Sequence, residues 1–225
     1  MGGKELNEIL EQAKEDRTLE EIVSDHLLLM YIIKKHSEIS RRYLGITKLQ
    51  KYAFLSENSM NKNKIKGLNY NFFRYDYGPI SKQLYKDIEL FRRLGIVYKD
   101  RIKLTEKGER VFEILKNTYQ KNKQVIQIID EQIQKLANMD TEQVKQYVYN
   151  LEKTFGFIKM KIKEIPMFFD ILSKLPKDKA KIRFEIDEET IETLNILLDD
   201  ETSNNILQTI KSKGKSVPYE GLVEL

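Results

Sequence analysis

The stretch GPISKQLYKDIELFRRLGIVYKDRIKLT, residues 78–105, decides the fold that we predict for this chain of 225 residues. Pro79 suits the first turn of a helix, where the amide that proline lacks would have no partner. Apolar residues then recur at spacings of 4, 4 and 3, at Ile80, Leu84, Ile88 and Phe91, which is typical of a helix that buries one face. The pattern predicts a helix over residues 80–94 that ends at Gly95.

A small hairpin is expected directly after that helix, because residues 96–104 read as two very short strands joined by a tight turn at Lys99 and Asp100. Upstream, helices are predicted over residues 18–36 and 47–58. Helix, helix, recognition-type helix and β-wing are the outline of a winged helix-turn-helix core. We therefore expect a mainly α fold with a small β component.

The segments around this core are expected to be polar or extended. The first predicted core helix opens with Thr18 and Glu21, a reciprocal capping pair. A polar helix is expected before it, over residues 4–15. Residues 58–67, rich in Asn and Lys, are expected to form a loop. The aromatic run NYNFFRY, residues 69–75, predicts a short strand that Gly78 and Pro79 break.

A long helix is predicted after the wing, over residues 105–138. Its apolar seam steps by 4 and 3 in alternation, which is a heptad pattern with one polar position. Such a helix either pairs with its copy in a homodimer or packs along its own domain, and the pattern leaves both open. The seam consists of Leu115, Tyr119, Asn122, Ile126, Ile129, Ile133 and Leu136.

The remainder is expected to be an α/β C-terminal extension. A helix over 140–154 precedes the stretch FGFIKMKIKEIPMFFDIL, residues 155–172, which is apolar and basic. For this stretch we favour core packing over contact with a membrane or a partner helix. Alternating apolar residues over 182–186 predict a strand, and acidic helices are predicted over 188–198 and 202–211.

Composition excludes several chemistries. The chain has no cysteine, so it forms no disulfide, zinc knuckle or iron–sulfur site, and we expect a cytoplasmic protein. Its longest apolar run, residues 27–33, is too short to span a membrane. The net charge of +4 is uneven, with +11 over residues 31–110 and −5 over residues 181–225. Unequal ends are typical of chains whose parts meet different partners, although both can be ordinary solvated surfaces.

Four motifs in fixed order carry a resemblance to a known family. They are KLQK at residues 48–51, YGP at 77–79, LGI at 94–96 and LTEKG at 104–108. In this order they resemble the Panacea domain, which is the SocA-like antitoxin domain, and the related YwgA-like winged-helix proteins. The resemblance covers residues 18–155.

The resemblance implies three segments and a non-catalytic function. Residues 1–17 would be an N-terminal helix, 18–155 a Panacea-like winged-helix domain, and 156–225 an extension that is acidic from residue 181. The family's members act in toxin–antitoxin systems by binding. The resemblance thus implies an antitoxin-type protein that neutralises a cognate toxin or partner protein, or delivers it for degradation, and it transfers no catalytic residue.

The residues themselves also give little support to catalysis. The only histidines, His26 and His36, lie ten residues apart on one predicted helix, too far apart to share a metal without other ligands. No glycine-rich phosphate loop is present in the sequence. We therefore expect no enzyme, no metal and no cofactor.

Two binding hypotheses follow. In the first, the acidic tail docks a protein partner through an apolar helix face, unless these residues close the domain's own core. The residues concerned are Phe184, Ile186, Leu194, Leu197, Ile206 and Ile210.

In the second hypothesis the winged helix binds double-stranded DNA as a transcriptional regulator. Phosphate contacts would come from Arg41, Arg42, Lys48 and Lys51. Base edges would be read by Lys82, Gln83 and Lys86, and the wing would add Lys99, Arg101 and Lys103. The competing interpretation is a winged helix that serves as a protein-interaction scaffold, and we favour partner-protein binding.

Overall fold

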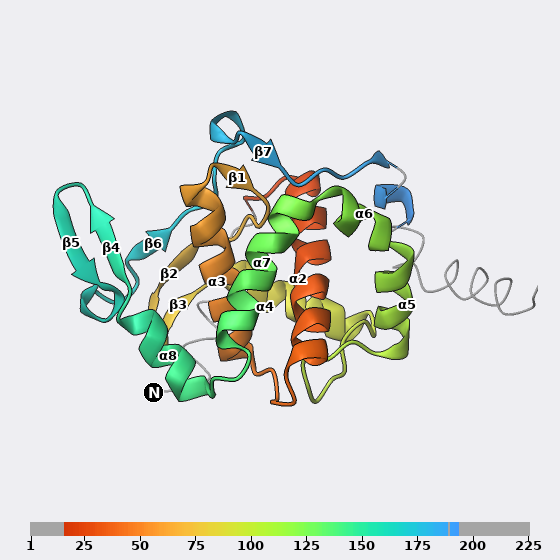
Figure 1. The fold of residues 1–225 in the computed structure, drawn as a ribbon, viewed down its shortest axis with the longest axis horizontal. Coiled ribbons are helices and arrows are strands. Elements are labelled where there is room, and N and C mark those ends of the chain that lie inside the picture. Colours follow the sequence, from red (N-terminus) through yellow and green to blue (C-terminus); the bar gives the residue numbers. More distant parts are fainter. Residues whose placement is uncertain (1–15, 189, 194–225) are drawn as a thin grey trace, which may run out of the picture. The chain divides into compact units, whose positions relative to one another are not determined.

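The computed structural model describes residues 16–188 and 190–193 of the chain (Figure 1). The chain divides into two compact units, residues 1–187 and 188–225. The described part of the first unit is mainly helical with small sheets, as expected. No helix in the described part of the chain is both long and apolar enough to cross a membrane.

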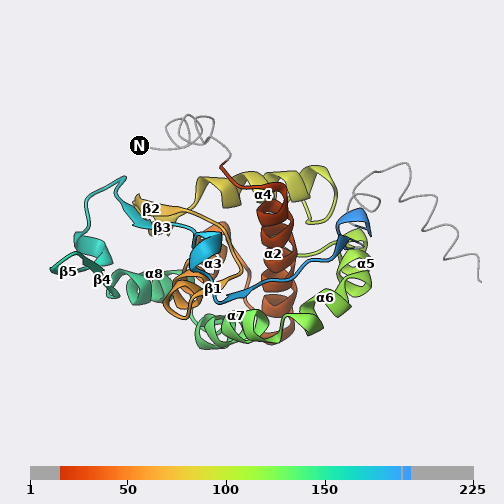
Figure 2. The same ribbon diagram turned by 90° about the horizontal axis from the view of Figure 1, so that it is seen from above.

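Two central helices form the middle of the first unit. They are α2 (Leu19–Ile39) and α3 (Ile46–Lys62). They lie between α7 (Lys123–Leu136) on one side and α4 (Lys82–Arg93) on the other (Figures 1 and 2). Because α2 is covered on several sides, its consecutive residues Leu27, Leu28 and Leu29 are all fully buried.

The predicted start of α2 is confirmed in detail. The Thr18 hydroxyl accepts the Glu21 amide at 3.3 Å, and the Glu21 carboxylate accepts the Thr18 amide at 3.0 Å. This reciprocal pair satisfies two amides that have no partner within the helix. The helix expected over 47–58 also exists, but it extends to Lys62, so much of the expected polar loop is helical.

The predicted continuous helix over residues 105–138 is wrong. The chain forms α5 (Glu106–Ile114), α6 (Lys116–Lys121) and α7 instead, with breaks at Leu115 and Asn122. At the second break, the Asn122 amide donates to the carbonyls of Thr118 (2.8 Å) and Glu185 (2.9 Å), and its oxygen accepts the Glu185 amide (2.6 Å). A tertiary contact therefore overrides the local helical pattern.

The apolar seam of this region packs inside the unit. Leu115, Tyr119, Ile129 and Ile133 are buried, and α7 contacts both α2 and α3. Of the two alternatives that the heptad pattern leaves open, packing along the chain's own domain is the observed one. The seam is not available for a coiled-coil homodimer, because these side chains already lie in the core.

The main sheet has the strand order β3-β2-β6, with antiparallel pairs. Its strands are β2 (Phe72–Tyr75), β3 (Gly78–Ile80) and β6 (Asp170–Leu172). The expected strand in the aromatic run exists. The strand ends at Tyr75, before Gly78 and Pro79, as expected. The placement of Pro79 in the first turn of a helix is wrong, because Gly78 and Pro79 belong to β3 and α4 begins only at Lys82. Gly78 has φ +91, a backbone conformation that favours glycine.

The expected wing is reduced to a minimal hairpin. Val97 and Leu104 form an isolated antiparallel bridge, and the Tyr98 amide donates to the Lys103 carbonyl at 3.1 Å. Neither of the two expected strands extends beyond this bridge. Helix α4 is thus followed by a turn in the place of the expected wing, but the two sides of this turn form only one β-bridge.

A second hairpin follows α8 (Thr141–Tyr149), which begins with a capping box between Asp140 and Gln143. The helix expected over 140–154 ends at Tyr149, and β4 (Glu152–Phe155) and β5 (Ile158–Lys161) come next. The hairpin projects at one end of the first unit (Figure 1).

The boundary expected between residues 155 and 156 falls inside this hairpin. After it come two short 3-10 helices, η1 (Ile162–Glu164) and η2 (Lys177–Lys179), and strands β6 and β7 (Ile182–Arg183). Strand β7 pairs in parallel with β1 (Ile65–Lys66), and β6 pairs with β2. Residues 156–187 therefore complete the first unit rather than form a separate extension.

Candidate functional site

The KLQK motif is a buried clamp. The amine of Lys48 donates to the carbonyls of Ala137 (2.9 Å) and Met139 (2.7 Å). Gln50 exchanges two hydrogen bonds with the Ser81 backbone, and the Lys51 amine donates to the Pro79 carbonyl at 2.8 Å. These contacts fasten α3 to the end of α7 and to the YGP segment. Lys48 and Lys51 are 2% and 0% exposed, so their assignment to DNA phosphate contacts is wrong.

Gln83 is also misassigned as a base-reading residue. It is buried, its oxygen accepts the Ser81 hydroxyl, and its amide donates to Asp16. Lys82 is half-buried with its amine over the Phe73 ring at 5.4 Å. Exposed members of the set lie in the α2–α3 turn, on α4 and in the turn after α4; they are Arg41, Arg42, Lys86, Lys99, Arg101 and Lys103.

The described part of the proposed tail interface lies in or near the core. Phe184 is 4% exposed, and its amide donates to the Lys66 carbonyl at 2.7 Å, so it closes the domain's own core. Ile186 is half-buried. Leu194, Leu197, Ile206 and Ile210 lie outside the described residues.

A buried ionic cluster fixes α4 against α2. The Arg17 guanidinium donates to Asp25 (2.8 Å) and to Asp87 (2.7 and 3.1 Å), and the Tyr70 hydroxyl donates to Asp87 at 2.8 Å. Burial raises the pKa of Asp25 to about 7 despite Arg17. Burial would also raise the pKa of Asp87, but hydrogen bonds from His26 and Arg17 outweigh it and lower that pKa to about 2. Arg17, Tyr70 and the two carboxylates satisfy one another, so we assign the cluster a structural role.

The most unusual surface lies on the β4–β5 hairpin and the segment that follows it. Core packing was expected for residues 155–172, and it holds for Ile162, Ile165 and Ile171, which are buried. It is wrong for five large apolar side chains, which we call the hairpin surface. Their exposed fractions are 106% for Phe157, 61% for Ile158, 41% for Met167, 54% for Phe168 and 48% for Phe169.

Backbone pairing holds this surface in place. The Phe168 amide donates to the Arg74 carbonyl (2.7 Å), and the Arg74 amide donates to the Phe169 carbonyl (2.8 Å). Phe168 has φ +64, a backbone conformation that residues other than glycine and asparagine rarely adopt. It costs on the order of 1–3 kcal/mol. Strain of this kind concentrates at functional sites, so the outlier points to a role for the exposed ring.

Ring contacts tie the exposed side chains to the sheet. The Phe168 ring lies 6.4 Å from Phe73 and 5.8 Å from Tyr75, and Phe155 meets Phe169 edge to face at 5.3 Å. Each such pair adds about 0.5–1.5 kcal/mol beyond burial. The rings are therefore pre-ordered while their outer faces remain open to water.

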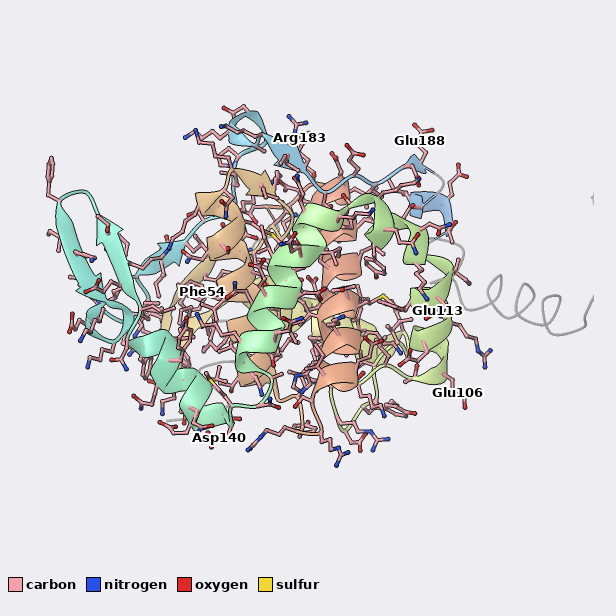
Figure 3. The ribbon with its side chains drawn as sticks, viewed as in Figure 1. Phe54, Glu106, Glu113, Asp140, Arg183 and Glu188 are labelled. Carbon is pink, nitrogen blue, oxygen red and sulfur yellow. The ribbon has the colours of Figure 1, made fainter. Side chains whose placement is uncertain are left out.

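Charges frame the hairpin. The Lys159 amine pairs with the Glu152 carboxylate and lowers the pKa of Glu152. At the base, Lys153 donates to Asn58 at 2.6 Å, and its amine lies over the ring of Phe54. Phe54 is labelled on α3 in Figure 3. Burial, with a smaller contribution from Lys62, lowers the pKa of Lys153 to about 8. Lys153 thus anchors the hairpin, whereas Lys159 is exposed on it.

The sequence carried a signal for this surface, namely the basic apolar stretch itself. What it could not show was which of the apolar residues would face inward. Among the described residues, no group of three or more His, Asp or Glu side chains is arranged to hold a metal. No protein-family model, curated protein or solved structure matches the chain.

Proposed function

We propose that this chain is a non-catalytic, antitoxin-type binding protein of the cytoplasm that holds a cognate toxin or other partner protein on the hairpin surface. The observation that carries the proposal is the exposure of five large apolar side chains on one hairpin and its neighbouring segment. Together they expose on the order of 500 Å². Patches of that size on soluble proteins are often functional, and they match the core of a standard interface.

The resemblance to the Panacea domain supports the proposal of an antitoxin-type function. Its four motifs pack in two coupled pairs in this fold. KLQK bonds to the YGP segment through Lys51 and Pro79, and LGI meets LTEKG where the Thr105 amide donates to the Ile96 carbonyl at 3.0 Å. A Cβ on Gly108 would lie 2.3 Å from that carbonyl, so the glycine permits the close approach. The four motifs thus stabilise the fold, and we place partner binding on the hairpin surface instead.

The test is affinity capture of the tagged full-length protein from its native host, with nuclease treatment and mass spectrometry. We expect one protein in stoichiometric amount, retained after nuclease. Phe157→Asp should abolish capture, because it places a charge at the most exposed of the five apolar side chains. The matched control is Leu19→Asp, which alters another exposed apolar residue (65% exposed) on α2. Equal capture by both variants would refute the proposal.

A second candidate function is duplex DNA binding by α4 and the turn after it. The observation in its favour is that six of the ten residues assigned to DNA stay exposed, including Lys99, Arg101 and Lys103 in one turn. Affinity should then fall steeply with salt as phosphate contacts release counterions. Changing these three residues to Ala should reduce the salt dependence as well as the affinity. No duplex binding at low salt would remove this candidate.

A further inference from the structure

Strands β4 and β5 form a sheet of their own. Among the described residues, each pairs only with the other. A hairpin of two strands is marginally stable in water, and pairing of a third strand along one of its edges is one of the ways in which such hairpins become stable. An open strand edge is also a template for pairing with another chain. The hairpin therefore has a vacant position beside it.

The register shows which backbone groups face that position. The pairs run from Phe155 with Ile158 at the turn to Glu152 with Lys161, and the Ile162 amide donates to the Leu151 carbonyl at 2.9 Å. In antiparallel pairs, hydrogen-bonded and non-bonded pairs alternate. The bonded pairs are thus those of Ile158, Met160 and Ile162. The amide and carbonyl of Lys159 and the carbonyl of Lys161 point outward, while the Lys161 amide donates to Glu164 at 2.9 Å.

The two faces of β5 differ in chemistry. Side chains alternate along a strand, so Lys159 and Lys161 lie on one face and Ile158 and Met160 on the other. A strand added beside β5 would place alternate side chains next to these lysines and next to these apolar residues. A second copy of β5 would set lysines near lysines, which is unfavourable. Within the described strands, Glu152 of β4 is the one acidic side chain paired with Lys159 on this face, and it faces two lysines, so acidic side chains on the added strand complement the remaining positive charge.

We propose that β5 accepts an extended segment of the partner protein as a third strand, and that this segment alternates apolar and acidic residues. The inference rests on the proposed function and specifies it. Main-chain hydrogen bonds to Lys159 and Lys161 provide the pairing, and the alternation provides the specificity. The apolar side chains of the segment continue the hairpin surface beside Ile158.

The first test uses blocked eight-residue peptides and the full-length chain at pH 7. The probe alternates Val and Glu. One control has the same composition in the order VVEEVVEE, and another alternates Val and Lys. We expect saturable binding of the probe, at least about tenfold tighter than either control, with slower amide exchange at Lys159. No saturable binding at millimolar peptide, or equal binding of all three, would overturn the inference.

Proline variants test the edge itself. Lys159→Pro removes the outward amide of β5 without removing a backbone hydrogen bond between β4 and β5. It also removes the ion pair with Glu152, so Lys159→Ala, which loses that ion pair but keeps the amide, is measured beside it. Thr154→Pro is the matched control, because Thr154 pairs with Lys159 and its amide points to the opposite edge. We expect Lys159→Pro to lose at least about tenfold in affinity for the probe and Thr154→Pro to keep it. Circular dichroism checks that both variants fold. Equal affinity of the two variants would contradict strand addition at β5.

The same variants separate this inference from the proposed function in affinity capture. If Phe157→Asp and Lys159→Pro lose the partner while Thr154→Pro keeps it, both statements are supported. If only Phe157→Asp loses the partner, the hairpin surface binds it and strand addition is wrong. If Phe157→Asp keeps the partner, the proposed function is wrong, and the peptide experiment alone decides whether β5 accepts a strand.

Discussion

At Lys51 a single hydrogen bond holds a lysine amine in the core. The amine donates to the Pro79 carbonyl, and burial, with Arg74 nearby, lowers the pKa of Lys51 to about 7. An unfolded chain keeps this lysine protonated up to a pKa of about 10.4. Between these two values the unfolded state binds more protons than the folded state, so this residue makes stability rise with pH.

The expected result is a difference in pH dependence between the wild type and Lys51→Met. From pH 7 to pH 10 the free energy of unfolding of the wild type should rise relative to that of the variant by roughly 1 kcal/mol per pH unit. Urea unfolding at several pH values measures it. Parallel curves for the two proteins would mean that folding does not lower the pKa of Lys51.

Single residues also show where sequence reasoning succeeds. The capping pair of Thr18 and Glu21 was predictable, because it depends only on neighbours in the chain. The role of Lys48 and Lys51 was not, because lysine is almost always a surface residue and nothing local marks the carbonyls that they reach. Their partners lie 89 and 28 residues away in the sequence.

At the scale of elements, the β4–β5 hairpin depends on its turn. Gly156 has φ +60 in a two-residue loop. No atom lies within 4 Å of a Cβ added there, so a substitution at Gly156 affects only the backbone conformation and causes no steric clash. Gly156→Ala should cost the hairpin about 1 kcal/mol, which speeds amide exchange of Ile158 and Met160 by about fivefold. Gly156→Asn should stay nearer the wild type, because asparagine tolerates positive φ. Equal exchange in the two variants would contradict this turn geometry.

The break between α6 and α7 gives a second prediction for an element. Asn122→Leu restores an apolar heptad seam but leaves the Glu185 backbone without its two side-chain bonds. We expect a loss of about 2–3 kcal/mol in the free energy of unfolding and no gain in self-association. Urea unfolding and sedimentation measure the two effects. A variant that becomes more stable and dimeric would show that the seam can act as a coiled coil.

Elements with strong local patterns were the ones predicted well. Helices α2 and α8 begin at their predicted capping residues, and α4 follows its apolar spacing. The helix over 105–138 failed because its pattern continues through Asn122, where contact with Glu185 interrupts it. The hairpin surface could not be derived because periodicity shows which residues share a face, not whether another element covers that face.

For the whole molecule, the proposed partner-binding surface lies in the first compact unit. The competing hypothesis uses the tail residues Leu194, Leu197, Ile206 and Ile210. A full-length variant with all four changed to Ser should capture the partner as well as the wild type, because the hairpin surface is unchanged. Affinity capture from the native host measures this. Loss of the partner by a folded variant would show that the tail residues bind it.

The most direct measurement of the central claim is site-specific photo-cross-linking in the native host. A photoreactive amino acid replaces Phe157 in the full-length protein, and position 19 on α2 serves as the control. We expect one partner protein to be cross-linked from position 157 and not from position 19. No protein cross-linked from position 157, or the same proteins from both positions, would contradict it.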